Sequence, residues 1–320
     1  MNIDDIQNNN QNGDFDSTPK KKKRVGKSIY SIAIVLLSGI MLFSLYKVIS
    51  ISAQYRAGDT EYEDIADEFV QSYETYALPN TERPVVTEPA ETDFFEEAMT
   101  DYESALTGTE TESAPETTEK EKGPEPLKES VIVVPKVDID HLKSKNPDFA
   151  GWIYIDGTVV NYPVAKGVDN DYYLAHTFYG QKNINGSIFL DYRHDLSADN
   201  KNLLFYGHHM KSGAMFAVLR KYVWYDFYYS HKYITYVTEE GTYLITVFSA
   251  YNVSEVSDAW KIDFANDEEY AAWLKNIKRA SQVPTDITPT VEDKVVTLTT
   301  CSFAYDNARI VVHGIIEPLF

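Results

Sequence analysis

The chain of 320 residues contains a single cysteine, Cys301, which ends the apolar run KVVTLTTC that starts at Lys294. A lone cysteine cannot form an intrachain disulfide, so in an exported protein it is either a buried small side chain or a reactive thiol. Arg309 follows eight residues later and opens the next apolar run, RIVVHGII. If both runs are strands, Cys301 and Arg309 lie at the same end of a sheet. The guanidinium could then reach an oxygen bound at the sulfur.

A candidate proton donor, His208, lies in the segment Tyr206–Met210 (YGHHM), directly after the apolar run Asn202–Tyr206. Gly207 permits a sharp turn, so this imidazole is also expected at a strand end. Together, a thiolate can attack a carbonyl while an imidazolium gives a proton to the leaving amine. Arg309 would stabilise the oxyanion of the tetrahedral intermediate. The three residues therefore predict acyl-transfer chemistry.

Each of these residues also has an ordinary structural explanation. A cysteine at a strand end is often a small buried hydrophobe, and the pair His208–His209 could be solvated or could bind a metal. We predict no metal and no other cofactor, because one cysteine and scattered histidines do not give the ligand spacing of a zinc site. The other histidines have no such setting: His141, His176, His194, His231 and His313.

The segment from Val131 to Phe320 is predicted to fold into a domain dominated by strands. Short β-branched and aromatic runs, many of them separated by Gly, Asn and Asp, are typical of strands. They lie at Thr158–Val164, Ser187–Asp191, Leu203–Tyr206, Tyr233–Thr238, Tyr243–Val253, Lys294–Thr300 and Arg309–Ile316. Many short strands with few helices favour a closed or nearly closed β-barrel.

Two helices and one tight turn complete this domain. Asp138–Asn146 is expected to form a helix ahead of Pro147. A second helix is expected after Asn266, an N-cap residue, because apolar residues follow it at helical spacing. Glu239–Gly241 is a predicted hairpin turn between two strands.

The N-terminal part of the sequence predicts a membrane anchor. The cluster Lys20–Arg24 precedes Ser28–Tyr46, which is 19 residues without a charge and about the length that a helix needs to cross the hydrocarbon layer. By the positive-inside rule the N-terminus is cytoplasmic and the rest extracellular, at the cell membrane. We predict a basic cytoplasmic tail over 1–27 and one transmembrane helix over 28–51. A cleaved signal peptide would have a shorter apolar run and a small-x-small site.

The residues 52–130 are predicted to form an acidic, disordered extracellular stalk. From Ile51 to Ser130 there are 22 acidic and 5 basic residues, with many Glu, Thr and Pro. Such a segment is too polar to bury a core, although Tyr62–Tyr76 and Phe94–Leu106 could form short helices. The net charge of the chain is −20. We therefore expect no nucleic-acid partner, because phosphate binding needs a basic face.

Three motifs resemble one known family, the sortases. TLTTC, ending at Cys301, resembles the sortase signature Thr-Leu-x-Thr-Cys, with Arg309 at the start of the next strand. NLLFYGHHM resembles the segment of the catalytic histidine, in which the His after Gly is catalytic. That order selects His208 over His209.

Other features resemble class B sortases in particular. They are NGSIFLDYRHD at Asn185–Asp195, the pair Met215-Phe216, and the helix expected between Tyr251 and Val291. The resemblance implies a mainly β fold: a sortase-like closed β-barrel, 131–320, with an N-terminal helix and an inserted helix, preceded by the transmembrane helix and the stalk.

The resemblance also implies an activity and a set of site residues. A sortase cleaves a C-terminal sorting motif of secreted proteins, holds the acyl group on its cysteine, and transfers it to an amine of a peptidoglycan precursor or a pilin. The implied catalytic residues are His208, Cys301 and Arg309. The implied substrate-binding residues are Asn170, Leu174 and Thr299.

Two other classes of protein remain open at this point. One is a cell-wall Cys/His hydrolase or an L,D-transpeptidase, which would place its cysteine in a different local sequence. The other is a non-catalytic wall-binding β-domain, which has no need for Cys, His and Arg at strand ends.

Overall fold

The computed structural model describes the backbone of residues 25–78, 131–195, 200–254, 257–301 and 308–320, and the side chains of the same ranges apart from 25–29 and 301. The chain divides after Ser52 into two units. Helix α1 (Val25–Phe69) begins in the first unit. Among the described residues, this helix alone is long and apolar enough to cross a membrane, with a mean hydropathy of 2.3 in its most apolar window.

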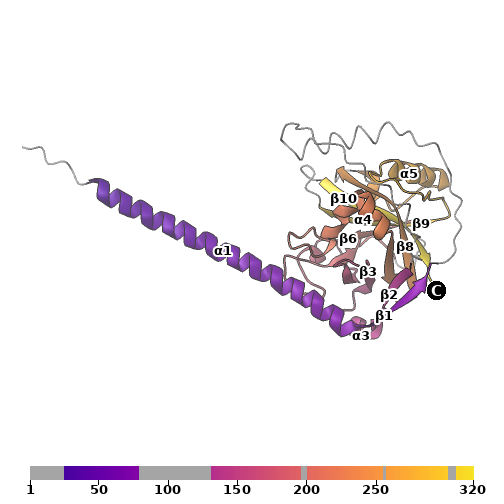
Figure 1. Cartoon of the computed structure of the whole chain (residues 1–320), viewed down its shortest axis with the longest axis horizontal. Helices are drawn as coiled ribbons and strands as arrows, with labels where there is room; N and C mark the ends of the chain where they lie inside the picture. Colours follow the sequence, from indigo (N-terminus) through magenta and orange to yellow (C-terminus); the bar gives the residue numbers. More distant parts are fainter. Residues whose placement is uncertain (1–24, 79–130, 196–199, 255–256, 302–307) are drawn as a thin grey trace, which may run out of the picture. The chain divides into compact units, whose positions relative to one another are not determined.

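Eight strands of the second unit close into a barrel in the order β10-β8-β7-β3-β4-β5-β6-β9. Several of these strands are labelled in Figure 1. Their bounds are β3 Phe149–Tyr154, β4 Asn161–Ala165, β5 Ile188–Leu190, β6 Asn202–Tyr206, β7 Tyr233–Val237, β8 Thr242–Ser254, β9 Lys294–Cys301 and β10 Ala308–Pro318. Neighbouring strands are antiparallel except for the parallel pairs β4–β5 and β6–β9. The predicted closed β-barrel is confirmed.

Both faces of the strands near the candidate site are covered. On β10, Ile310 and Val312 pack into the barrel interior. Val311 and Ile315 instead join an outer cluster with the apolar face of helix α5 (Asp267–Arg279). Period-two alternation along the strand produces this division. The outer cluster is built from the regularly spaced residues of α5: Tyr270, Trp273, Leu274 and Ile277.

Local signals place the helices and the turn as expected. Asn266 Oδ1 accepts a hydrogen bond of 2.9 Å from Glu269 N and caps α5, the inserted helix. Asp138 Oδ1 accepts one of 3.1 Å from His141 N and caps the N-terminal helix α3 (Ile139–Lys145). Thr238 N donates to Gly241 O at 2.8 Å, which closes the hairpin turn between β7 and β8. The remaining short helices are η1 Tyr172–Leu174, η2 Phe216–Val223, α4 Tyr225–Ser230 and η3 Asp258–Trp260.

Strand β3 is not predicted by the sequence pattern, because Gly151 interrupts its apolar run. The structure shows why this position is glycine. Its φ is +155°, and a Cβ there would lie 2.5 Å from the ring of Tyr236. Strand β4 begins at Asn161 rather than Thr158, because Thr158 N donates to Ile155 O in a turn that precedes the strand.

The folded unit begins earlier than the predicted domain boundary at 130/131. The second unit starts at Ala53, and the last part of α1 buries Tyr62, Ile65 and Phe69 at 2%, 1% and 0% exposure. These apolar residues lie on one helical face, while the acidic residues between them point outward. The high density of acidic residues masks this amphipathic pattern in the sequence, and 53–77 packs with the folded unit.

Strand pairing also constrains the remainder of the predicted stalk. Strand β1 (Val70–Ala77) pairs antiparallel with β2 (Val131–Val137), and Ala77 is the Cα partner of Val131 (Figure 1). The two ends of the segment 79–130 are therefore held together. Its expected helix at Phe94–Leu106 lies outside the described residues.

We expect Phe69→Ala to lower the free energy of unfolding by about 3 kcal/mol, the usual cost of emptying a buried phenylalanine site. Phe69 is fully buried, its ring packs at a tilt against His141 with 4.8 Å between centroids, and its carbonyl accepts from Asp138 N. Urea unfolding of the full chain measures the loss. The neighbouring exposed residue gives the control, Asp67→Ala, which should change stability by less than about 0.5 kcal/mol. Equal effects of the two changes would mean that 53–77 does not belong to the folded unit.

Candidate active site

The parallel pairing of β6 with β9 brings His208 and Cys301 to the same end of the barrel. Tyr206 is the Cα partner of Thr299, and each candidate residue follows two positions later. Gly207 N donates to Thr299 O at 3.2 Å, which extends the ladder past the end of β6. Parallel strands run in the same direction, so the C-terminal ends of β6 and β9, with the two candidate residues, lie at the same edge of the sheet.

The antiparallel pairing of β9 with β10 adds Arg309. Arg309 and Cys301 are Cα partners, directly opposite each other on adjacent strands. Opposed Cα atoms in such a pair are separated by about 5 Å. The guanidinium of Arg309 donates through Nη1 to Ala308 O at 3.2 Å. The register thus agrees with the expected placement of 301 and 309 across the short connection between their strands.

The imidazole of His208 is oriented by a main-chain carbonyl. Its Nε2 lies 2.7 Å from Leu174 O, at the end of η1. A carbonyl oxygen only accepts, so Nε2 carries the hydrogen and Nδ1 holds the lone pair of the neutral ring. Nδ1 is therefore the atom available to take up and return a proton. His208 is half-buried, as an acid/base group between core and solvent should be.

Backbone contacts link the two ends of the loop that follows His208. Phe216 N donates to His208 O at 3.0 Å, and His209 forms a backbone bridge with Met215. Met215 has a φ of +55°, rare for a non-glycine residue, and its N–H donates to Tyr162 OH at 3.2 Å. These contacts fix the path of the chain on the C-terminal side of His208.

Asn170 is held by a buried carboxylate that the sequence reasoning did not assign. Its Nδ2 donates to Asp191 Oδ2 at 3.1 Å, and its Oδ1 accepts from Tyr192 N at 3.0 Å. Asp191 also accepts from Tyr206 OH and from both Nε and Nη2 of Arg193. Burial alone would raise the pKa of Asp191, but these hydrogen bonds and the Arg193 charge lower it to about 2.

The Asp191 network connects Asn170 to the catalytic end of the barrel, because Tyr206 is the last residue of β6. The motif NGSIFLDYRHD contains Asp191 and Arg193, but local sequence cannot show that its carboxylate bonds to a residue 21 positions earlier. Only a fold that brings the two segments together reveals the role.

The other two expected substrate-binding residues differ in their access to solvent. The side chain of Leu174 is 39% exposed beside His208. Thr299 is 2% exposed, and its Oγ1 has no hydrogen-bond partner among the described residues. A buried hydroxyl offers a substrate little surface, whereas Leu174 offers both an apolar side chain and a position next to the imidazole.

Two other histidines are buried in settings that keep them neutral. Burial lowers the pKa of His313 to about 3 and also lowers that of His194. His313 Nδ1 lies 2.8 Å from Thr297 Oγ1, and Nε2 lies 3.1 Å from Tyr251 OH. Neither histidine is suited to donate protons near neutral pH. Within the described part of the chain, no group of three or more His, Cys, Asp or Glu side chains could hold a metal ion.

Comparison with known proteins identifies the family. The family model of the sortase domain matches residues 153–317. Sortase B of Staphylococcus aureus (strain NCTC 8325 / PS 47) is 40% identical over 175 residues, which cover 54% of this chain and 72% of the relative. Sortase B of Listeria monocytogenes serovar 1/2a (strain ATCC BAA-679 / EGD-e) is 33% identical over 179 residues, covering 55% and 73%.

Solved structures give the same result for the fold. A Staphylococcus aureus sortase B–substrate complex matches with a TM-score of 0.55 and 38% identity, covering 57% of this chain and 85% of that one. Clostridium perfringens sortase B matches with a TM-score of 0.54 and 35% identity, covering 56% and 98%.

The fold and the matches define a cysteine transpeptidase. The chain belongs to the sortase family, and it is similar to the class B sortases. This result confirms the resemblance of the motifs and excludes the wall-binding domain, the Cys/His hydrolase and the L,D-transpeptidase.

The neutral state of His313 predicts a specific pH dependence of stability. Its pKa is about 3 in the folded protein against 6.5 in the unfolded chain. Above pH 6.5 neither state binds the proton, so stability is unaffected. Between 6.5 and 3 only the unfolded state binds it, and stability falls by about 1.4 kcal/mol per pH unit.

Urea unfolding from pH 7 to 4 measures this slope. The variant His313→Gln should have a slope that is smaller by the His313 contribution of about 1.4 kcal/mol per pH unit. The carboxylates titrate in both proteins, so their contribution cancels when the two slopes are compared. Parallel curves for the two proteins would show that folded His313 is protonated in this range.

Proposed function

We propose that this protein is a membrane-anchored extracellular sortase that cleaves a C-terminal sorting motif of secreted proteins and transfers them to an amine of the cell wall or of a pilin. The observation that carries the proposal is the register of three strands: Cys301 opposite Arg309, with His208 at the end of the parallel neighbour. A sortase B structure in complex with triglycine, 39% identical to this chain, supports a peptide amine as the acceptor.

In the first half-reaction, the thiolate of Cys301 attacks the carbonyl carbon of the scissile amide. Arg309 donates hydrogen bonds to the oxyanion of the tetrahedral intermediate. His208 gives the proton on Nδ1 to the leaving amine, and the C–N bond breaks to leave a thioester on Cys301. The carbonyl of Leu174 keeps its hydrogen bond to Nε2 throughout, so only Nδ1 exchanges protons.

In the second half-reaction, the acceptor amine loses a proton to Nδ1 of His208 and attacks the thioester. The second tetrahedral intermediate collapses, the C–S bond breaks, and the thiolate of Cys301 is regenerated. The product is a new amide, and no cofactor is consumed.

Asn170 and Leu174 are the proposed contacts for the sorting motif. Asn170 is fixed by Asp191, and it still has one amide hydrogen available for a peptide carbonyl. Leu174 presents an exposed apolar side chain. For Thr299 we propose an indirect role, because its side chain is buried and its carbonyl accepts from Gly207 N, next to His208.

The proposed membrane anchor is the apolar part of α1, over 28–51. The helix is long and apolar enough to span a bilayer, and a cluster of basic residues precedes it. By the positive-inside rule, the tail 1–27 is cytoplasmic and the barrel extracellular.

A peptide library tests the proposal directly. The full chain in detergent should cleave a subset of the peptides and join the acyl part to added triglycine, as read by mass spectrometry. Cys301→Ala should give neither cleavage nor transfer, because the thiolate is the proposed nucleophile. A melting curve serves as the control for folding. Turnover of any peptide by folded Cys301→Ala would refute the mechanism.

Arg309 should act mainly on the chemical step. The oxyanion exists only in the intermediate and transition state, so Arg309→Ala should lower kcat by on the order of 100-fold. Arg309→Lys should lose a substantial part of that rate, since lysine keeps the charge but not the planar fork of donors. Steady-state kinetics on the cleaved peptide measure both variants. If Arg309 only stabilises the surface, both will have near-normal kcat and a slightly lower Tm.

A further inference from the structure

The carbonyl that orients His208 is the last one of η1, and the loop that follows folds back on this short helix. The loop Ala175–Ser187 leaves η1 directly after Leu174 and returns to it, because Ser187 N donates to Tyr173 O at 2.8 Å. Asn183 N donates to Ala175 O at 3.0 Å and closes the loop at its other edge. The position of Leu174 O therefore depends on where this loop is held.

Gly186 connects the loop to the imidazole. Its φ is +57°, and a Cβ at this position would lie 2.8 Å from Leu174 O and 3.0 Å from Cδ2 of His208. No side chain fits between them. The backbone of Gly186 thus packs directly against both members of the hydrogen bond that fixes the tautomer of His208.

Tyr62 of α1 binds this same backbone. Its hydroxyl donates to Gly186 O at 2.7 Å, lies 2.9 Å from Ser187 Oγ, and accepts from Phe178 N at 3.1 Å. The residue is 2% exposed, so these hydrogen bonds do not compete with solvent. The Tyr62 hydroxyl therefore binds the loop both near its start, at Phe178, and at its end, at Gly186 and Ser187.

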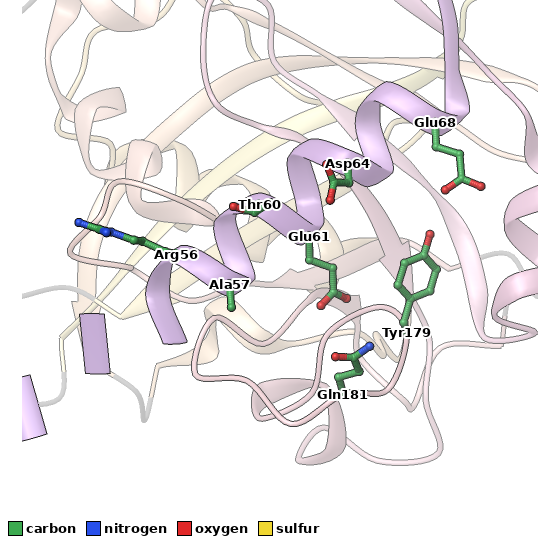
Figure 2. A pocket seen from close by; sticks show the side chains of 8 residues that line it. All are labelled: Arg56, Ala57, Thr60, Glu61, Asp64, Glu68, Tyr179 and Gln181. Atoms are coloured by element: carbon green, nitrogen blue, oxygen red, sulfur yellow. The ribbon is translucent and has the colours of Figure 1, made fainter. Parts of the chain in front are cut away.

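Further contacts dock the loop on the same helix. Asn185 Nδ2 donates to Asp59 Oδ1 at 2.7 Å, and a Cβ at Gly58 would lie 2.5 Å from that nitrogen. Figure 2 shows the outer edge of the contact, where Glu61 and Glu68 of α1 border an open cleft with Tyr179 and Gln181 of the loop.

The ring of Tyr62 reaches the other segment that holds His208. It packs edge-on against Tyr162 at 5.4 Å, and the Tyr162 hydroxyl accepts from Met215 N in the loop that follows His208. Tyr62 thus supports the catalytic histidine from two sides: through Gly186 and Leu174, and through Tyr162 and Met215.

We propose that Tyr62 is a positioning residue for catalysis, which holds the Ala175–Ser187 loop so that Leu174 O keeps His208 in its Nε2–H tautomer. The inference rests on the proposed role of His208 as the acid and base. Without the Tyr62 hydroxyl, Gly186 O and Phe178 N lose their hydrogen bonds to α1, the backbone beside Leu174 O shifts, and Nε2 of His208 is no longer held as the protonated nitrogen. The N-terminal helix is then part of the active-site support.

Tyr62→Phe in the full chain tests the proposal, because it removes the hydroxyl and keeps the ring. We expect kcat for transfer of the library peptide to triglycine to fall about 10-fold or more, since small misplacements of a catalytic group are costly. KM should change little. The ¹⁵N spectrum of His208 should change from a single Nε2–H tautomer to a mixture.

The matched control is Tyr222→Phe. Tyr222 is also fully buried, and its hydroxyl also donates to a backbone carbonyl, that of His231 at 2.9 Å. This variant should lower Tm but leave kcat and the His208 spectrum unchanged. Gly186→Ala provides a second disturbance of the loop without a change in α1, and it should reproduce the loss of kcat and of the single tautomer.

The outcomes separate this inference from the proposed function. If folded Tyr62→Phe has wild-type kcat and a single tautomer, or if Tyr222→Phe shows the same losses, Tyr62 is only structural and the inference is wrong. His208→Ala tests the underlying role: an active His208→Ala protein removes His208 from the mechanism, and the inference about catalysis fails with it.

Discussion

A buried chain of hydrogen bonds across four adjacent strands fixes the register that brings the proposed catalytic residues to one end of the barrel. Thr297 of β9 donates to Asn202 Oδ1 of β6 at 2.8 Å and is paired with His313 of β10. His313 in turn bonds to the hydroxyl of Tyr251 on β8. All four residues are at most 6% exposed. Buried polar groups that are fully hydrogen-bonded favour one strand pairing over others, because a different pairing would leave them without partners.

A shift in the pairing of these strands would cost free energy, and this cost favours the observed register over the alternatives. A slip of one residue moves every side chain of a strand to the opposite face. A slip of β9 would move Thr297 into the apolar barrel interior, away from His313, and would move Val296 out of it. An unpaired buried polar group costs about 1–3 kcal/mol. The same slip would also separate Cys301 from Arg309 and from the end of β6, so stability and catalysis select the same register.

The sequence predicts the parts of the site that depend on local pattern. The strand ends at Cys301 and Arg309, the turn at Gly207 and the cap at Asn266 follow from residues close to one another. The bond between Asp191 and Asn170 and the bond between Tyr62 and Gly186 do not, since each joins segments that only the folded chain brings together. Tyr62 lies 124 positions from Gly186. Burial of Thr299 is likewise a property of the assembled sheet.

The acidic region shows the limit of composition as a guide. The many acidic residues between the candidate span and the barrel predict an extended stalk. Tyr62, Ile65 and Phe69, however, lie on one face of the helix and pack into the core of the folded unit. A contact of this helix with the loop comes at Gln54, whose carbonyl accepts from Asn183 Nδ2, three residues after the proposed span ends at 51. The acidic segment 79–130 instead connects two paired strands. The proposed anchor and the residues of α1 that contact the Ala175–Ser187 loop are therefore adjacent along one helix.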